Sequence, residues 1–547
     1  MMPGSVINRV KGETPMIKRE TIFHSGNPER IWEKFCGFLD LSLSEFMDIQ
    51  KGLLMEQINL VWDSPLGKVI MNKKKPKNLE EFRSFIPLTT YDDYAGYIGE
   101  CQEDALAIKP ELWAHTSGRG GQFKWIPYSM QALEKLGDAA LSELILAATD
   151  YKGEVNIREG SYFLSVLAPR PYISGVTSLA FSERFGLKLL PPQDVAEKLD
   201  YRRRIEVGFE MALRHDVDVI GALGTVLVQM GQRITEQSQG MKFSWSLLHP
   251  VVLSRLIRAW FSSKIQRRAM LPCDLWPAKG LACGGTDASI YKKTLEYYWG
   301  KTPHEIYGAT EALGVLAMQS WAKKGVTFYP FLNFLEFIPE EERLKSQKDK
   351  DYQPATVLLD EVKTGEIYEL VITNFYGLPF LRYRLSDLIK VISLEEVETG
   401  IKLPQFIFHA RADDLIDLYS IVRLDENTLW QAITDTQIGY SDWSARKEYE
   451  NNWPILRLYI ELKEEVESEI VATRLNECLQ TLSAFYKEAV EEAQTNPVRV
   501  TPLPAGSFSR YYEMKQKAGA DLAHLKPSHM NAPDSAIQDL LRVSKQI

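Results

Sequence analysis

The chain has 547 residues, of which 45% are hydrophobic and 25% are charged, the usual proportions of a globular protein. Its 73 acidic residues outnumber 64 basic ones, and a net charge of −9 argues against a general nucleic-acid binder. No apolar run reaches the ~18 residues that a membrane span requires, and the first residues lack the apolar core of a signal peptide. The five cysteines are scattered without a CxxC pair, so we expect neither a disulfide framework nor a Cys-rich zinc site, and we expect a cytoplasmic location.

Most of the chain has the pattern of an α/β protein. Residues 1 to about 105 are predicted to be mostly helical. From about 110 to 410, short apolar runs typical of strands, such as 162–167 and 370–372, alternate with amphipathic helical stretches, which indicates an α/β sheet. The charged segment 340–351 lies between Pro339 and Pro354 and is predicted to be an exposed loop or a frayed turn.

The last ~130 residues have their own short pattern, in the order strand, helix, strand, helix. Residues 456–462 alternate like a strand, and apolar residues then recur at helical spacing from Ile470 to Val490, which predicts one long amphipathic helix. A second strand at 498–500 and another helix follow. We therefore expect a small C-terminal α+β domain, with domains at 1–410 and 411–547.

A glycine-rich segment, TSGRGGQFK at 116–124, precedes a helix-like stretch. Its three glycines allow positive φ and a close backbone approach to a ligand, and such a loop can hold phosphate oxygens with its N–H groups. The spacing is not that of a Walker loop, and a plain turn is the alternative. The candidate nucleotide-binding residues are Thr116, Ser117, Gly118, Arg119, Gly120, Gly121 and Lys124.

A second segment, YGATE at 307–311, follows a short predicted strand. About twenty residues upstream, another strand end turns through Gly284, Gly285 and Thr286. Open α/β sheets hold ligands beyond such strand ends. Thr310 offers a hydroxyl for a phosphate and Glu311 a carboxylate for Mg²⁺, although Thr-Glu is also typical of a helix N-cap.

A third segment, YRLSD at 383–387, precedes the strand-like run 388–391. A carboxylate at a strand start, here Asp387, can accept hydrogen bonds from the two hydroxyls of a ribose. The alternative for this aspartate is a salt-bridged surface turn.

Taken in order, TSGxxGxxK, GGT, YGxTE, YRxxD and RADD resemble the adenylate-forming superfamily of acyl-AMP synthetases over about 110–420. The C-terminal sequence resembles the plant auxin-responsive (Gretchen Hagen) acyl-acid amido synthetases and their bacterial relatives. The similar segments are 456–462, PAGSF at 504–508 and Lys526-Pro527. The resemblance covers nearly the whole chain. It implies a large N-terminal adenylation domain with mixed sheets and helices, followed by a small mobile lid domain.

The resemblance also implies an activity. A small carboxylic acid, aromatic by analogy, would react with ATP and Mg²⁺ to an acyl-adenylate, and an amino acid would then attack to give an amide and AMP. The implied catalytic residues are Thr310 at the α-phosphate, Glu311 as the Mg²⁺ ligand and Lys526, which would reach into the site. The remaining implied roles are phosphate binding by 116–121 and Lys124, nucleotide binding by Gly284, Gly285, Thr286, Tyr307, Gly308 and Ala309, ribose binding by Asp387 and Arg411, and a hinge at Asp413.

Two alternatives stay open. Arg119 and Gly120 stand where the family usually has Ser or Thr, and Ser386 replaces a usual Gly, so a nucleotide-binding homologue with weakened catalysis is one alternative. An aryl- or acyl-CoA ligase of the phenylacetate type is the other, because RADDLI at 411–416 resembles those ligases too. They carry a glycine soon after the hinge, whereas 417–423 has none, which favours the amide-forming reaction. The identity of the acid and the oligomeric state are left open.

Overall fold

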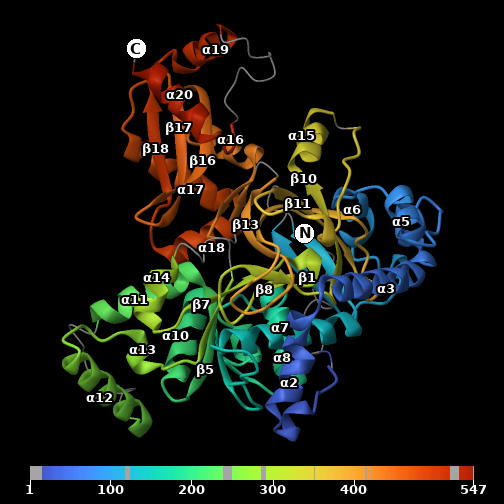
Figure 1. The fold of residues 1–547 in the computed structure, drawn as a ribbon. Coiled ribbons are helices and arrows are strands. Elements are labelled where there is room, and N and C mark those ends of the chain that lie inside the picture. The colour runs from blue at the N-terminus through green and yellow to red at the C-terminus, as the bar shows by residue number, and fades with distance from the viewer. Residues whose placement is uncertain are drawn as a thin grey trace. The chain divides into compact units, whose positions relative to one another are not determined.

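The computed structural model describes residues 15, 17–117, 123–237, 249–284, 291–349, 351–412, 415–419, 422–517 and 529–545. Figure 1 shows the strands and helices of the chain. The chain divides into two compact units. The larger contains residues 1–116 and 124–412, and the smaller consists mainly of residues 413–547. Sheets and helices alternate through both units, so the predicted α/β class is confirmed.

The larger unit begins with helices, as the sequence predicted. In chain order they are η1 (Ile22–Ser25), α2 (Pro28–Cys36), η2 (Gly37–Asp40), α3 (Leu43–Trp62), α4 (Pro65–Ile70), α5 (Leu79–Phe85), α6 (Asp92–Ile98) and η3 (Glu103–Ala105). The longest, α3, starts at a capping box, in which Ser42 and Glu45 satisfy each other's backbone N–H groups. Its Gln50 side chain donates to the carbonyl of Asn333 at 2.7 Å, which ties this helix to the central sheet.

The central sheet has eleven strands. Its spatial order is β10-β11-β12-β13-β9-β8-β7-β6-β5-β3-β4. The strands are β3 (Tyr162–Ser165), β4 (Lys188–Leu190), β5 (Val217–Leu223), β6 (Gly280–Gly284), β7 (Pro303–Tyr307), β8 (Ala317–Gln319), β9 (Val326–Phe328), β10 (Asn333–Pro339), β11 (Ile367–Asn374), β12 (Tyr383–Ser393) and β13 (Gln405–Arg411). Strands β4, β3, β5, β6 and β7 run parallel, and the remaining neighbours pair antiparallel.

Helices cover the parallel half of this sheet. They are α7 (Met130–Ala147), α8 (Ile173–Phe185), α9 (Gln193–Ala196), α10 (Tyr201–Ala212), α11 (Gly224–Gln237), α12 (Pro250–Ile265), α13 (Pro272–Leu275) and α14 (Lys292–Trp299). Helix α7 packs on β6 and β7, while α10 packs on β3 and α11 on β5. Strands β5 and β6 are buried along most of their length, as expected for parallel strands covered on both faces.

Smaller elements complete the larger unit. Strands β1 (Leu112–Ser117) and β2 (Phe123–Tyr128) form a separate two-stranded sheet, and η7 (Thr310–Ala312) and η8 (Leu359–Glu361) are single turns. The segment expected to be a loop at 340–351 is instead a helix over most of its length, α15 (Glu340–Lys348). The loop prediction was wrong because the charged residues form a helix with acids in its first turn and lysines in its last, which suits the helix dipole.

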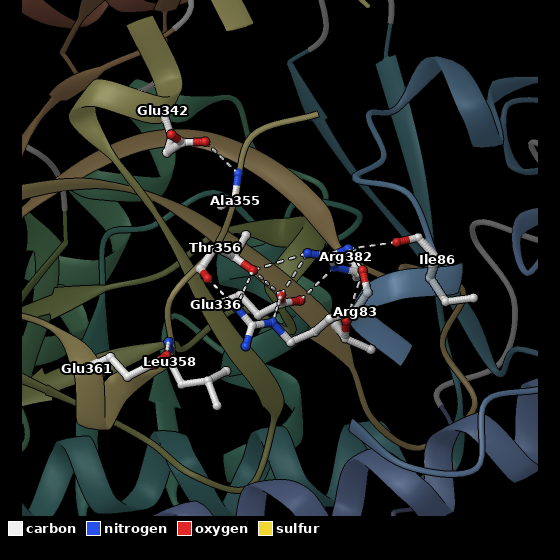
Figure 2. A network of polar contacts seen from close by, with 10 residues as sticks. Arg83, Ile86, Glu336, Glu342, Ala355, Thr356, Leu358, Glu361 and Arg382 are labelled. Atoms are coloured by element: carbon white, nitrogen blue, oxygen red, sulfur yellow. Dashed lines mark hydrogen bonds and ion pairs between the residues drawn. The ribbon is translucent and has the colours of Figure 1, made fainter. Parts of the chain in front are cut away.

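A buried ion pair joins the N-terminal helices to the antiparallel half (Figure 2). The Arg382 guanidinium donates to both carboxylate oxygens of Glu336, at 3.0 and 2.9 Å, and both side chains are almost fully buried. Its remaining nitrogen donates to the carbonyls of Arg83 and Ile86, each at 2.7 Å. Thr356 completes the shell of Glu336 with a hydroxyl at 2.7 Å. The charges are therefore matched and hydrogen-bonded, which a buried pair requires.

The smaller unit is a three-stranded sheet with helices on both faces. Its elements are β14 (Ile416–Leu418), β15 (Val422–Leu424), α16 (Glu426–Asp435), β16 (Tyr440–Glu450), β17 (Trp453–Leu462), α17 (Ser468–Leu482), α18 (Ala484–Ala493), β18 (Val498–Leu503), α19 (Ser507–Lys517) and α20 (Asp534–Ser544). Leu458 and Ile460 of β17 belong to the apolar cluster of α16–α18, whereas Tyr459 joins that of α19 and α20.

The single long helix expected over 470–490 is two helices. They break at Ser483, whose extended backbone ends α17 and whose side chain caps α18 by accepting from the N–H of Tyr486 at 3.2 Å. Serine is a preferred N-cap residue, so the break has a local cause that apolar spacing alone did not reveal.

We predict that Arg382→Met destabilises the larger unit by about 3–5 kcal/mol, because it leaves the Glu336 carboxylate buried without its main partner. Chemical denaturation followed by tryptophan fluorescence measures the change. Lys324→Met is the matched control, since the ion pair of Lys324 with Glu398 is exposed and contributes roughly 0–1 kcal/mol. Equal losses in the two variants would contradict the role given to the buried pair.

Candidate functional site

The carboxyl ends of β6 and β7 lie side by side. The two strands run parallel, and Gly284 at the end of β6 pairs with Ile306, next to Tyr307 at the end of β7. The chain then turns tightly, since the N–H of Leu316 donates to the carbonyl of Tyr307 at 2.8 Å. A Cβ on Gly308 would lie 1.7 Å from the carbonyl oxygen of Gly314, so only glycine fits this position.

Thr310 and Glu311 occupy the single turn η7 and are both buried. The residue at the N-cap of this turn is Ala309, and no side chain caps it, so the N-cap alternative for Thr310 is not what the structure contains. The turn is held through its carbonyl groups. Tyr128 donates its hydroxyl to the carbonyl of Thr310 at 2.7 Å, and Asn374 donates its amide to that of Glu311 at 2.9 Å.

The Glu311 carboxylate faces a lysine from a distant part of the chain. Lys124 Nζ in β2 lies 3.4 Å from Glu311 Oε1 and 3.5 Å from the hydroxyl of Tyr383 in β12. The same ammonium group lies 5.1 Å from the ring centroid of Tyr91, within range of a cation–π contact. Segments from four parts of the chain therefore converge on one cation.

The two tyrosines around Lys124 stay uncharged at neutral pH. Burial raises the pKa of Tyr91 to about 12, and burial together with the negative charge of Glu311 raises the pKa of Tyr383 well above its ordinary value. Phenols with such pKa values surround the ammonium without adding negative charge. Glu311 is therefore the carboxylate in direct contact with Lys124 among the described residues.

A second group of polar side chains is centred on Asp387. The Tyr307 hydroxyl donates to Asp387 Oδ2 at 2.8 Å, and Arg411 donates to Asp387 Oδ1. Asp387 and Arg411 face each other across the antiparallel pair β12–β13, and both side chains are mostly buried. The alternative of a salt-bridged surface turn is therefore not observed, and Asp387 lies within β12 rather than at its start. Each carboxylate oxygen keeps a further lone pair for another donor.

The backbone next to Asp387 explains a departure from the family pattern. Ser386 has φ +60°, the left-handed region in which glycine is favoured, and its carbonyl accepts from the N–H of Ala412 at 2.7 Å. A serine here adopts the conformation that the usual glycine would take at less cost.

The remaining expected residues divide into two groups. Thr116 lies near the end of β1 and Ser117 ends it, while Gly284 and Ala309 flank the site as strand end and turn. The positions outside the described residues are Gly118, Arg119, Gly120, Gly121, Gly285, Thr286, Asp413 and Lys526. Within the described part of the chain, no group of three or more His, Cys, Asp or Glu side chains could hold a metal ion.

The two histidines beside the motifs are buried. His115 packs on the Tyr172 ring at 4.4 Å, and burial lowers its pKa to about 4. His304 meets the Gln319 carbonyl at 2.8 Å, and burial lowers its pKa to about 3. Both are therefore neutral at pH 7.

Four residues that build this site were not predicted from the sequence: Tyr383, Tyr91, Asn374 and Tyr128, whose hydroxyl holds the Thr310 carbonyl. Tyr383 belongs to the YRxxD motif and could have been found there. Tyr91 and Asn374 had no local signal, because their roles come from contacts with Lys124 and with the Glu311 carbonyl, distant in sequence. Among the described residues, no helix is long and apolar enough to cross a membrane.

We predict that Gly308→Ala destabilises the larger unit by about 1–3 kcal/mol or more, because the added methyl group clashes with a carbonyl oxygen that cannot move away without breaking the turn. Gly284→Ala is the matched control: a Cβ there meets no atom within 4 Å, and folding should be unaffected. Urea denaturation of both variants gives the comparison. A stable Gly308→Ala protein would show that the turn after β7 is not closed as described.

Comparison with known proteins identifies two family domains in the chain. The GH3 family N-terminal domain model matches residues 37–236, and the GH3 family central domain model matches residues 326–411. A rice jasmonoyl–L-amino acid synthetase, GH3.5, is 25% identical over 49% of this chain and 48% of its own length. An Arabidopsis indole-3-acetic acid-amido synthetase, GH3.4, is 25% identical over 43% of this chain and 41% of its own. The chain thus spans about half the length of the curated relatives it matches.

A solved structure shares the fold. A 2-hydroxyisobutyryl-CoA ligase in complex with 2-HIB-AMP and CoA superposes with a TM-score of 0.55 at 15% identity, covering 85% of this chain and 87% of that one. The two GH3 models together match just over half of the 547 residues, in the segments that carry Lys124, Asp387 and Arg411. The chain belongs to the GH3 family.

Proposed function

We propose that the chain is an acyl-acid amido synthetase, which activates a small carboxylic acid with ATP as an acyl-adenylate and transfers the acyl group to the amine of an amino acid. The observation that carries the proposal is the convergence of Lys124, Glu311, Tyr307, Asp387 and Arg411. They come from segments up to 287 positions apart, between 124 and 411, and gather beyond the ends of parallel strands. Family membership supports the same reading.

Asp387 is proposed to bind the ribose. Its oxygens are held by Tyr307 and Arg411, so the carboxylate is fixed before a ligand arrives and has free lone pairs for the two hydroxyls. Arg411 also places a positive charge directly beside this mostly buried carboxylate. Tyr307 places its ring at the same strand end, where the adenine would lie against it.

Glu311 and Lys124 are proposed to act at the phosphates. A single buried carboxylate fits Mg²⁺, which is commonly bound by one or two protein carboxylates together with substrate phosphates. When bound, Mg²⁺ neutralises negative charge on the triphosphate. Lys124 provides a second cation beside Glu311, and Thr310 a hydroxyl for the α-phosphate. The loop 116–121, with Gly285 and Thr286, is proposed to complete this side.

Joining a carboxylate to a triphosphate brings two anions together, so cations must stabilise the transition state. Lys526 is proposed to enter the site from the smaller unit during this step, with Asp413 as the hinge of the lid rotation. The second step needs an amine held near the acyl carbon and the removal of one proton, which requires positioning more than a dedicated nucleophile.

We predict that Asp387→Asn raises the KM for ATP roughly 10- to 100-fold with little change in kcat, because ribose contacts are shared by ground and transition states. Acid-dependent ATP–pyrophosphate exchange measures both constants. The control is Asp360→Asn, an exposed aspartate in η8 that should leave both constants unchanged. Wild-type kinetics in the Asp387 variant would mean that the nucleotide binds elsewhere.

The acceptor distinguishes the proposal from a CoA ligase. The segment 417–423 has no glycine to admit a thiol, so we predict amide products from amino acids and no acyl-CoA. The enzyme is given ATP, Mg²⁺ and a panel of acids that includes aromatic carboxylates, with either twenty amino acids or CoA, and products are identified by mass spectrometry. An acyl-CoA product without any amide would establish the ligase alternative instead.

A further inference from the structure

In the smaller unit, His529 is held between two carboxylates. Its Nδ1 lies 2.5 Å from Glu426 Oε1 in α16, and its Nε2 lies 2.9 Å from Asp442 Oδ1 in β16. The ring also stacks on Trp443, with centroids 4.6 Å apart and planes 15° apart. When both carboxylates are ionised they can only accept, so a ring that bonds to both donates from both nitrogens as an imidazolium. We call this arrangement the histidine clamp.

The groups around the clamp favour this charge. Asp442 is held on its other oxygen by the Tyr512 hydroxyl from α19. Burial raises the pKa of Tyr512, which therefore stays a neutral donor. Hydrogen bonds to Asp442 and Glu426 raise the pKa of His529 above its ordinary value. Glu426 and Asp442 contact the His529 ring and Tyr512 contacts Asp442, while the charges of Glu461 and Tyr511 also raise the pKa of Tyr512.

The clamp fastens a short stretch of backbone to the sheet. The carbonyl of His529 accepts from the N–H of Ala445 at 2.7 Å, and the N–H of Asn531 donates back to the carbonyl of Ala445 at 2.8 Å. Met530 thereby forms a parallel bridge with Ala445 and is buried in the main apolar cluster of this unit. The Asn531 side chain donates to the carbonyl of Leu415 at 3.0 Å. Residues 529–531 are thus an extra edge segment of the sheet.

The histidine clamp lies close in sequence to Lys526. Lys526 stands three residues before His529, so covalent geometry keeps their Cα atoms within about 11 Å of each other. We propose that His529 is a positioning residue for the adenylation step: its clamp fixes the anchor from which Lys526 reaches the reacting phosphate. This inference rests on the proposed function, because it takes from it the role of Lys526.

The clamp makes that anchor sensitive to pH, and the sign follows from the raised pKa of His529. A group whose pKa is higher in the folded state stabilises the fold below its unfolded pKa, about 6.5 for histidine, and loses this contribution as the pH rises through its folded pKa. The anchor should therefore be complete at mildly acid pH and loosen on the alkaline side.

The test compares four variants of the full-length chain with the wild type between pH 6 and 9. His529→Gln removes the charge, and Asp442→Asn weakens its main partner. Lys526→Ala gives the rate without the lysine. His249→Gln is the control, an exposed histidine before α12 whose side chain makes no capping hydrogen bond. The readouts are kcat and KM for ATP in acid-dependent pyrophosphate exchange, and amide hydrogen exchange of 529–531 and Ala445, normalised to intrinsic rates.

We expect His529→Gln to lower kcat about 10- to 100-fold while KM for ATP changes little, because a displaced lysine affects the transition state more than nucleotide binding. The amides of 529–531 should lose protection in step with kcat as the pH rises. Asp442→Asn should move both transitions to lower pH, and His249→Gln should overlay the wild type.

Two results would overturn the inference. One is wild-type kcat in His529→Gln across the pH range, and the other is amide protection at 529–531 that does not change with pH or with Asp442→Asn. A wild-type chain without exchange for any acid would instead refute the proposed function, and the role of the clamp in adenylation with it. The amide measurement would still decide whether the charged histidine holds the segment.

Discussion

The site in the larger unit depends on one interaction: the buried Asp387 carboxylate accepts hydrogen bonds from Tyr307 and Arg411. Tyr307 belongs to the last parallel strand of the sheet and Arg411 to the antiparallel half, so one side chain links the two halves at a single point. A buried carboxylate is tolerable only with such partners. The Asp387 oxygens keep further lone pairs. The contacts that stabilise the buried carboxylate therefore also leave it able to bind a ribose, as proposed.

A second buried ion pair lies near this site and also joins distant parts of the chain. The buried Glu336–Arg382 pair fixes the chain just before Tyr383, and Thr89 exchanges backbone hydrogen bonds with residues 382 and 384. The N-terminal helices are thereby held against β12, and Tyr91 and Tyr383 reach Lys124 from the two joined segments. Helices that carry none of the predicted motifs therefore contribute to the geometry of the site.

The sequence predicted the parts of the fold that local pattern determines. The α/β class and the helical start were confirmed, and the strands predicted at 162–167, 370–372 and 456–462 from apolar periodicity correspond to β3, β11 and β17. The helix at 340–348 was missed because the placement of its charges stabilises it rather than apolar spacing. The break at Ser483 was missed because it depends on a single N-cap residue. In the site, motif order led to the prediction of Asp387 and Glu311, and the structure gives both of them buried polar surroundings. Tyr91 and Asn374 could not be predicted, since only the tertiary fold brings them to their partners.

In the proposed reaction, a carboxylate attacks the α-phosphate of ATP. Isotope transfer tests it directly: an accepted acid labelled with ¹⁸O in its carboxylate is converted with ATP and an amino acid, and AMP and phosphate are analysed by mass spectrometry. An acyl-adenylate breaks at the acyl carbon when the amine attacks, so the account predicts one ¹⁸O atom in AMP and pyrophosphate as the other product. Label in inorganic phosphate with ADP formation would show an acyl-phosphate route and contradict the account.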